Sequence, residues 1–234
     1  MVSFAANRET YLIIVMVVLC TLAFSASGHN VSKEDIASFR ALSGVQVVHY
    51  MWLGAKHMVT GYDHLLFLLG VIYYIKKLKD VFVLVSLFAL GHSVTLISGV
   101  ALSWTVSPYL VDAIIGFSVV YKGLDNLGAV DLFFDERPNE KLVVLVFGLF
   151  HGLGLATKLQ TLVVRDEGLI ANLLAFNVGV ELGQIAALFC ALLVLTFLPV
   201  LRDHRQTATA INSMLVILGC MLMSYQLRMY YLLN

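Results

Sequence analysis

Long apolar runs dominate this chain, and they leave few folds open to it. Six of them follow one another, at residues 58–75, 81–103, 108–124, 142–158, 169–199 and 209–227. A membrane-crossing helix needs about 20 mostly apolar residues, and these runs are continuous, without the alternation of a transmembrane β-strand. The sequence therefore predicts an all-α, polytopic helical membrane protein with about six transmembrane helices.

The charge content agrees with this prediction. Only 13% of the residues are charged, and the mean hydropathy is +0.89, whereas soluble domains carry roughly 25% charged residues. The formal net charge is zero, which argues against nucleic acid as a partner because such partners select basic surfaces. The lipid bilayer is the expected surrounding.

The N-terminal region predicts a signal peptide or an anchor helix over residues 1–28. Arg8 precedes the apolar stretch Tyr11–Ala23, and a run of small residues follows at 25–28, in the order that a secretory signal requires. Residues 29–56 are then expected to form an extracytoplasmic segment, and residues 57–234 a six-helix membrane domain.

Basic residues in alternate loops predict the orientation. They are Lys76, Lys77, Lys79, Arg137, Lys141, Arg202 and Arg205. Cytoplasmic loops carry an excess of Lys and Arg, so these loops are expected in the cytoplasm. The beginning of the first apolar run, with its two histidines, then faces the outside.

That beginning, Gly54–Phe67, reads G-A-K-H-M-V-T-G-Y-D-H-L-L-F. On one continuous helix His57, Gly61 and His64 would share a face, with Gly61 keeping that face open and Asp63 about 100° away. Two imidazoles and a carboxylate suit a divalent cation such as zinc, nickel or cobalt. The alternative interpretation is a hydrogen-bonded polar cluster at the membrane surface.

Other apolar runs also contain polar residues. They are His92, Asp112, His151, Asn177 and Glu181. Burying such groups in a membrane costs free energy, and where they occur they are usually functional. Most fall near the midplane or in the outer half, so several helices can direct them to one place. Alternatively, each one hydrogen-bonds across a helix pair and only holds the bundle together.

Glycines accompany both of these histidines, namely Gly91 beside His92 and Gly148, Gly152 and Gly154 around His151. Small residues of this kind predict close approach between helices. The segments 87–92 and 146–151 also resemble each other, and both are expected to run in the same direction through the membrane. Such an echo is typical of transporters built from parallel repeats.

Four motifs together resemble the HupE/UreJ family of bacterial membrane proteins. They are His57-x5-Asp63-His64, Gly91-His92-Ser93-x-Thr95-Leu96, Phe150-His151-Gly152-Leu153-Gly154 and Phe176-Asn177-x-Gly179-x-Glu181-x-Gly183-Gln184. The resemblance extends from about Gly54 to the last apolar run. It implies a bacterial inner-membrane protein of about six spans that acts as a nickel or cobalt permease associated with hydrogenase and urease maturation.

The resemblance also implies that His57, Asp63 and His64 bind the metal ion, and that metalloenzyme-maturation proteins or other membrane proteins are partners. One motif departs from the family pattern. In the hydrogenase-linked members the later histidine motif continues to a second His and a Glu, and the segment Gly154–Leu159 has neither. Glu181 is expected to supply that chemistry instead.

The predicted function is uptake of a divalent transition-metal ion. Nickel or cobalt is favoured by the resemblance, and zinc or copper also accepts such ligands. Capture is expected at the outer cluster of His57, Asp63 and His64. Transfer to His92, His151 and Glu181 would follow, supported by Asp112 and Asn177.

Two alternatives come from other functional classes. The protein could be an accessory or structural subunit of a membrane complex, in which case its polar residues are structural. It could instead be an intramembrane zinc-dependent hydrolase, in which bound zinc activates water beside His92, Ser93 and Glu181.

Overall fold

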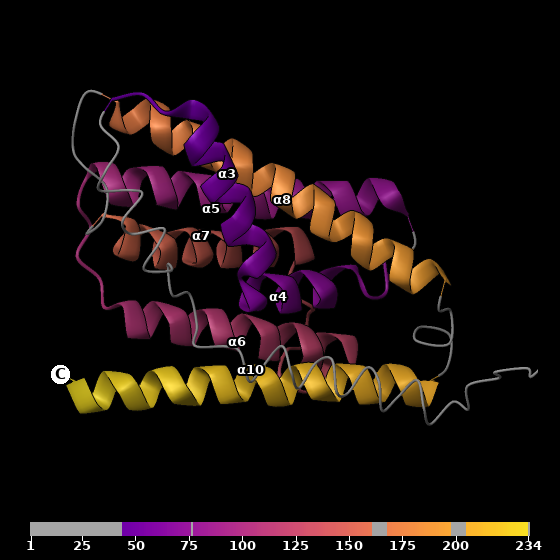
Figure 1. The fold of residues 1–234 in the computed structure, drawn as a ribbon. Helices are drawn as coiled ribbons and strands as arrows, with labels where there is room; N and C mark the ends of the chain where they lie inside the picture. Colours follow the sequence, from indigo (N-terminus) through magenta and orange to yellow (C-terminus); the bar gives the residue numbers. More distant parts are fainter. Residues whose placement is uncertain (1–43, 76, 161–167, 198–204, 234) are drawn as a thin grey trace, which may run out of the picture.

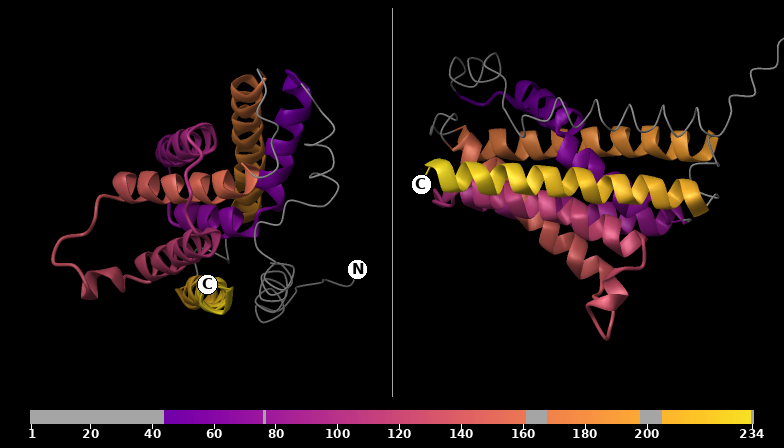
Figure 2. Two further views of the ribbon diagram at one scale, coloured as in Figure 1. Left: turned by 90° about the vertical axis from the view of Figure 1, so that its left-hand side faces the viewer. Right: turned by 90° about the horizontal axis from the view of Figure 1, so that it is seen from below.

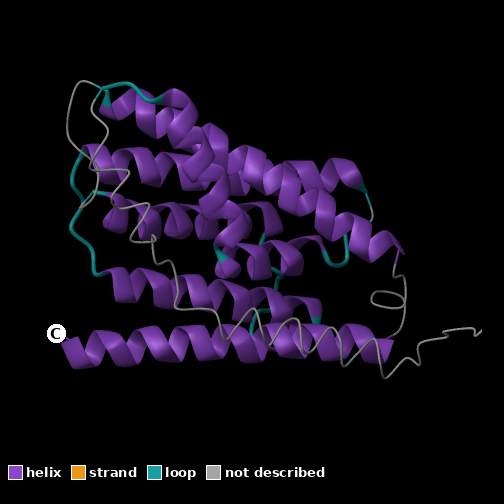
Figure 3. Ribbon diagram, viewed as in Figure 1, coloured by secondary structure: helices purple, strands orange, loops and turns teal. Residues whose placement is uncertain are grey.

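The computed structural model describes residues 44–75, 77–160, 168–197 and 205–233. Within these ranges it holds seven α-helices and one 3-10 turn, with no β-strand (Figure 3). The predicted all-α class is therefore confirmed. The predicted signal peptide or anchor helix at 1–28 lies outside the described residues.

The elements follow one another in a simple order. They are α3 (Val47–Thr60), α4 (Tyr62–Ile72), α5 (Leu78–Ala101), α6 (Pro108–Asn126), the turn η1 (Val130–Leu132), α7 (Glu140–Leu159), α8 (Leu169–Phe197) and α10 (Arg205–Leu233). Among the described helices α5, α7, α8 and α10 are long and apolar enough to cross a membrane. Figure 1 shows α8, a helix of 29 residues, inclined to α5.

Helix α6 is less apolar but similar in reach, because its 19 residues span about 28 Å. It carries Asp112, Lys122 and Asp125, and each of these takes part in an ion pair. Pairing lowers the cost of burying these charges in an apolar setting.

The first predicted span is wrong in detail. In place of one helix over 58–75, α3 ends at Thr60 and α4 begins at Tyr62, with Gly61 in an extended conformation between them. The break occurs inside the bundle (Figure 1). The two pieces have lengths of about 21 and 16 Å, and each is shorter than the roughly 30 Å of a membrane's hydrocarbon core.

The helical bundle includes residues that precede position 57. Helix α3 starts at Val47 and packs along α8. The Asn172 side chain fixes this start, because its Oδ1 accepts from Gln46 N at 2.7 Å and its Nδ2 donates to Gly44 O at 2.9 Å. Residues 47–56 are therefore part of the helical bundle.

Three helix pairs make up the bundle: α3 with α8, α5 with α7, and α6 with α10. Each pair meets at glycines. A Cβ added at Gly152 would collide with His92 O, one at Gly183 would lie 2.7 Å from Ala55 O, and one at Gly116 would lie 2.7 Å from Met223 N. The predicted close approach at Gly91, Gly148 and Gly152 is thereby confirmed, since all three touch the backbone across α5 and α7.

One end of the bundle is basic. Helices α5, α7 and α10 all begin there (Figure 1), and Lys77, Lys79 and Lys141 line one cavity of about 850 Å³. We call this the basic end and the opposite one the far end. The parallel course predicted for segments 87–92 and 146–151 is confirmed, because α5 and α7 run side by side from the basic end.

The loop between α6 and α7 projects sideways from the bundle (Figure 2). Inside it, Arg137 donates from Nε and Nη2 to the two carboxylate oxygens of Asp131. This guanidinium holds the pKa of Asp131 below its usual range. The Asn139 side chain then caps α7, because its Oδ1 accepts from the backbone N–H of Lys141 at 3.0 Å.

Candidate metal site

Four histidine rings from four helices lie together inside the bundle. His64, at the start of α4, is central: its ring centroid is 5.3 Å from that of His57 on α3, 5.8 Å from His92 on α5 and 4.9 Å from His151 on α7. We call these four residues the histidine cluster. The structure thus brings together all the histidines that the sequence singled out as metal ligands.

The position of the cluster corrects one expectation. The ion was expected to be captured at an outer cluster of His57, Asp63 and His64 and then transferred to His92 and His151. Instead His64, His92 and His151 are at most 1% exposed, and the His64 ring contacts both of the others. The reason is the break at Gly61, which ends α3 and starts α4 in the interior and so carries His64 to the middle of α5 and α7.

Gly61 allows this arrangement by its size. A Cβ at Gly61 would lie 2.9 Å from His64 Nδ1 and 3.0 Å from His57 O, so a larger residue would push the two histidines apart. Gly61 N still donates to His57 O at 2.8 Å, and Gly61 O accepts from Leu65 N at 3.1 Å. Gly61 thereby ends one helix and begins the next with its own backbone groups paired.

Hydrogen bonds orient two of the four rings. His64 Nδ1 lies 3.0 Å from Asp63 Oδ1, and His151 Nδ1 lies 2.8 Å from Phe147 O. An ionised carboxylate and a carbonyl only accept, so Nδ1 carries the proton in both rings. Each neutral ring then keeps its lone pair on Nε2, the atom that a metal ion would use.

Other nitrogens of the cluster are buried without a hydrogen bond. Within the described part of the chain His151 Nε2 has no hydrogen-bond partner, and the His92 ring has at most an interaction with the Asn177 side chain. Buried polar atoms are nearly always hydrogen-bonded, and exceptions call for an explanation such as an ion or a functional role. The cluster therefore has unused ligand capacity.

The ring nitrogens of the histidine cluster do not point at a common position in this structure. Among the described residues no group of three or more His, Cys, Asp or Glu side chains is arranged as a ready-made metal site. The rings meet largely edge to face. Bringing their Nε2 atoms to a common point would require the rings to rotate in place.

Asp63 and Asp112 take supporting positions. Asp63 is 8% exposed, and its Oδ1 also accepts from His64 N at 2.9 Å. Asp112 was expected to serve a histidine or the ion directly, but its Oδ2 accepts from Lys158 Nζ at 2.8 Å. The sequence analysis missed Lys158, although its position seven residues after His151 places both on one face of α7.

The polar residues of α8 separate into two groups. Asn177 is buried, and its Oδ1 accepts from Ser93 Oγ at 3.2 Å, next to His92. Gln184 is buried as well and lies 3.4 Å from Val85 O. Glu181, however, is exposed on the outer face of α8, so its expected place in the site is wrong. The helix turns it about 40° beyond Asn177, past the edge of the packed surface.

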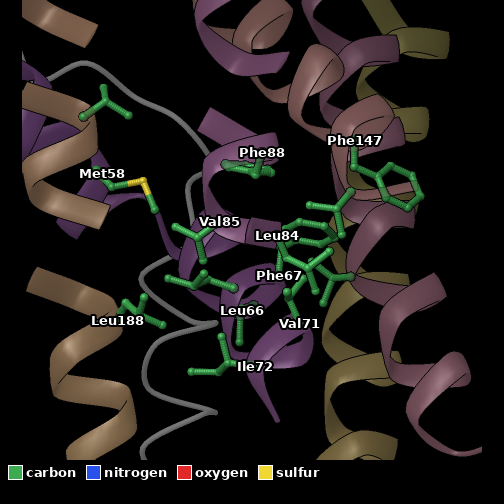
Figure 4. Packing of buried hydrophobic residues seen from close by; sticks show 14 of the residues in the cluster. Met58, Leu66, Phe67, Val71, Ile72, Leu84, Val85, Phe88, Phe147 and Leu188 are labelled. Carbon is green, nitrogen blue, oxygen red and sulfur yellow. The ribbon is translucent and has the colours of Figure 1, made fainter. Parts of the chain in front are cut away.

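Aromatic rings cover the cluster toward the basic end. The Phe67 ring lies 5.4 Å from that of His151, 5.3 Å from Phe88 and 5.7 Å from Phe147, and Figure 4 shows all three phenylalanines in the packed core. Phe67 also lines a cavity of about 610 Å³ that extends to Arg137 and Glu140. One aromatic layer thus separates the histidine cluster from a cavity at the basic end.

Comparison with known proteins adds the family. A family model described as "HupE / UreJ protein" matches residues 32–234, which is most of the chain and includes every residue of the histidine cluster. No curated protein and no solved structure matches the chain. The match agrees with the resemblance carried by the four motifs. The chain therefore belongs to the HupE/UreJ family of membrane proteins, whose roles are accessory or permease-like in nickel and cobalt handling.

Proposed function

We propose that this protein binds a divalent transition-metal ion, nickel or cobalt, at the histidine cluster and carries it across the membrane. The observation that supports this most is the meeting of four imidazoles from α3, α4, α5 and α7 around His64. Imidazole nitrogen is a ligand that suits nickel, cobalt and zinc. The metal ion is the substrate and passes through.

The surrounding residues prepare the rings for such an ion. Asp63 holds the Nδ1 proton of His64, which fixes the ring and raises the basicity of Nε2, as carboxylate–histidine pairs do in metal sites. Its negative charge also offsets part of the charge of the ion. The broken helix α3–α4 places backbone ends at the same point, an arrangement that transporters use at their ion sites.

The direction of transport is inward in this proposal. The basic end would face the cytoplasm, because loops rich in Lys and Arg stay on that side. An inside-negative potential of about 100 mV then favours entry of a double charge by about 4.6 kcal/mol. The sequence contains no nucleotide-binding motif, so the proposal does not use ATP as the direct driving force.

The test is metal binding by the detergent-purified protein, followed by uptake into proteoliposomes. Each protein is incubated with nickel, cobalt, zinc or copper, and the bound metal is measured by elemental analysis. We expect one ion per chain in the parent and in Glu181→Gln, and none in His57→Ala/His64→Ala. Full occupancy in the double variant would refute the cluster as the site, and binding without uptake would refute transport.

A second candidate function is that of a subunit in a larger membrane complex. The exposed Glu181 favours it, since a carboxylate on an apolar helix face costs several kcal/mol in lipid unless another protein covers it. Particle size after mild extraction from native membranes tests this candidate. Glu181→Leu should release a smaller particle, whereas an unchanged size would count against a complex held at this face.

The hydrolase alternative lacks one of the groups that were expected to serve it beside His92 and Ser93, because Glu181 is exposed on α8. The structure does not bring these three residues together.

A further inference from the structure

Two sets of ion pairs join α6 to α7, one on each side of the histidine cluster. Toward the far end, Asp112 of α6 pairs with Lys158 of α7 at 2.8 Å. Toward the basic end, Lys122 of α6 pairs with Glu140 of α7 at 2.7 Å. The signs are reversed between the two, because α6 supplies the acid in one pair and the base in the other.

The far-end pair is well enclosed. The side chains of Lys158 and Asp112 are 19% and 8% exposed. Gly154 makes room for the pair, since a Cβ there would lie 3.4 Å from Asp112 Oδ1 and 2.8 Å from Ile115 Cδ1. Lys158 and His151 share one face of α7, so the ammonium group stands between the cluster and the far end.

The basic-end pair is a three-membered group. Lys122 is 4% exposed, and its Nζ also donates to Asp125 Oδ2 at 2.7 Å. Gly70 of α4 accommodates the stem of this lysine, because a Cβ there would lie 3.0 Å from Lys122 Cγ. Lys122, Asp125 and Glu140 line the cavity of about 610 Å³ that ends at Phe67, and Phe67 contacts His151.

The order along α7 places the cluster between the two pairs. Glu140 begins the helix, His151 lies in its middle, and Lys158 is in its last turn. An ion that leaves the cluster along the seam between α6 and α7 must therefore pass one lysine–carboxylate contact in either direction. In this structure both contacts are closed.

We propose that these ion pairs are two gates for the histidine cluster, with Asp112–Lys158 closing the far end and Lys122–Glu140–Asp125 closing the basic end. The inference rests on the proposed transport function and adds its access control. A divalent cation approaching either gate competes with the ammonium group for the same carboxylates. The lysine leaves the carboxylate when the ion binds there. While the lysine remains paired with the carboxylate, its ammonium group repels other cations.

Removing a lysine should open its own gate only. A buried carboxylate without its partner is strongly unfavourable and gains from hydration, so water should enter from the end where the lysine was lost. The test measures this access with a thiol near the cluster. Cys20, Cys190 and Cys220 are replaced by alanine, and Ser93→Cys, next to His92, supplies the probe.

The purified variants are reconstituted in vesicles of known orientation and treated with a charged, membrane-impermeant methanethiosulfonate reagent from either side. We expect Lys158→Ala to speed labelling at least tenfold from the far-end side only, and Lys122→Ala to do so from the basic-end side only. Equal acceleration from both sides, acceleration from the wrong side, or unchanged labelling in both variants would overturn the proposal.

Three controls complete the design. Lys158→Arg and Lys122→Arg keep a cation in each pair and should label at the parent rate. Lys141→Ala removes an exposed lysine of the same helix and should also have no effect. Asp112→Asn breaks the far-end pair from the acid side, and Glu140→Gln combined with Asp125→Asn does so at the basic end, where Lys122 has two carboxylate partners. They replace any lysine variant that fails to fold, and they should open the same gates. Labelling needs no metal, so side-specific opening without uptake would refute transport while leaving the gates supported.

Discussion

The middle of α7 and the middle of α8 both carry an ionisable residue with glycines close by, but one residue lies inside the bundle and the other on its surface. The two residues are His151 of α7 and Glu181 of α8. His151 is fully buried in the histidine cluster, whereas Glu181 is exposed on the outer face of α8. A polar residue in an apolar helix therefore indicates that the position has a structural or functional role. It does not show whether the side chain faces the interior or the surface.

The spacing to the glycines explains the difference. Gly148 and Gly152 lie three residues before and one residue after His151, within about 100° of it around the helix. Gly179 and Gly183 lie two residues on either side of Glu181, which is about 160° away. In both helices the glycine face packs against a neighbour. The histidine is thus turned toward the packed side, and the glutamate away from it.

Breaking the glycine contact of α7 should have the largest effect. In Gly152→Val the new side chain would overlap His92 O and Thr95 Oγ1, so α5 and α7 must separate. We expect a loss of about 3 kcal/mol in the free energy of unfolding. Overpacking costs about 1–3 kcal/mol, and the upper value applies because backbone atoms can move away less easily than side chains. The thermal midpoint in detergent measures it. Ala186→Val, on the exposed face of α8, is the matched control, and an equal loss there would contradict this account.

Removing the buried histidine tests the other half of the comparison. His151→Ala deletes a ring that contacts His64, Phe67 and Phe88. We expect metal affinity to fall by more than the roughly 10–100-fold that loss of a merely orienting group costs. Titration with nickel and cobalt in the purified protein checks this. Affinity within threefold of the parent would show that His151 is a packing residue.

Asp63→Ala should have a smaller effect than loss of a histidine. The substitution removes the acceptor of the His64 Nδ1 proton but leaves all four rings. Affinity should fall by roughly 10–100-fold, and Asp63→Asn, whose Oδ1 can still accept, should recover part of it. An Asp63→Ala protein as weak as His64→Ala would instead make Asp63 a direct ligand.

The sequence predicted the helical class, the limits of most helices and the residues of the cluster, because apolar length and glycine-flanked histidines are local signals. It did not predict the break at Gly61, since His57 and His64 share a face equally well on an unbroken helix. Lys122 and Lys158 were missed because their partners on other helices, Glu140 and Asp112, lie 18 and 46 residues away in the chain. Pairs of that kind depend on how helices pack, which a single sequence does not encode locally.

Glu181→Gln should have the smallest effect on metal binding, because this side chain lies on the exposed face of α8. The family motif joins Asn177 and Glu181 in one stripe, yet only Asn177 points inward, where it meets Ser93. We expect nickel and cobalt affinities within twofold of the parent for Glu181→Gln, and a clear loss for Asn177→Ala, which leaves Ser93 and the surroundings of His92 without the amide. If Glu181→Gln binds metal as weakly as a histidine variant, α8 must turn its carboxylate inward when the ion is present. The exposed face of α8 would then belong to the transport cycle, because moving Glu181 to the place of Asn177 beside His92 takes a rotation of about 40° and a shift of about 6 Å along the helix axis.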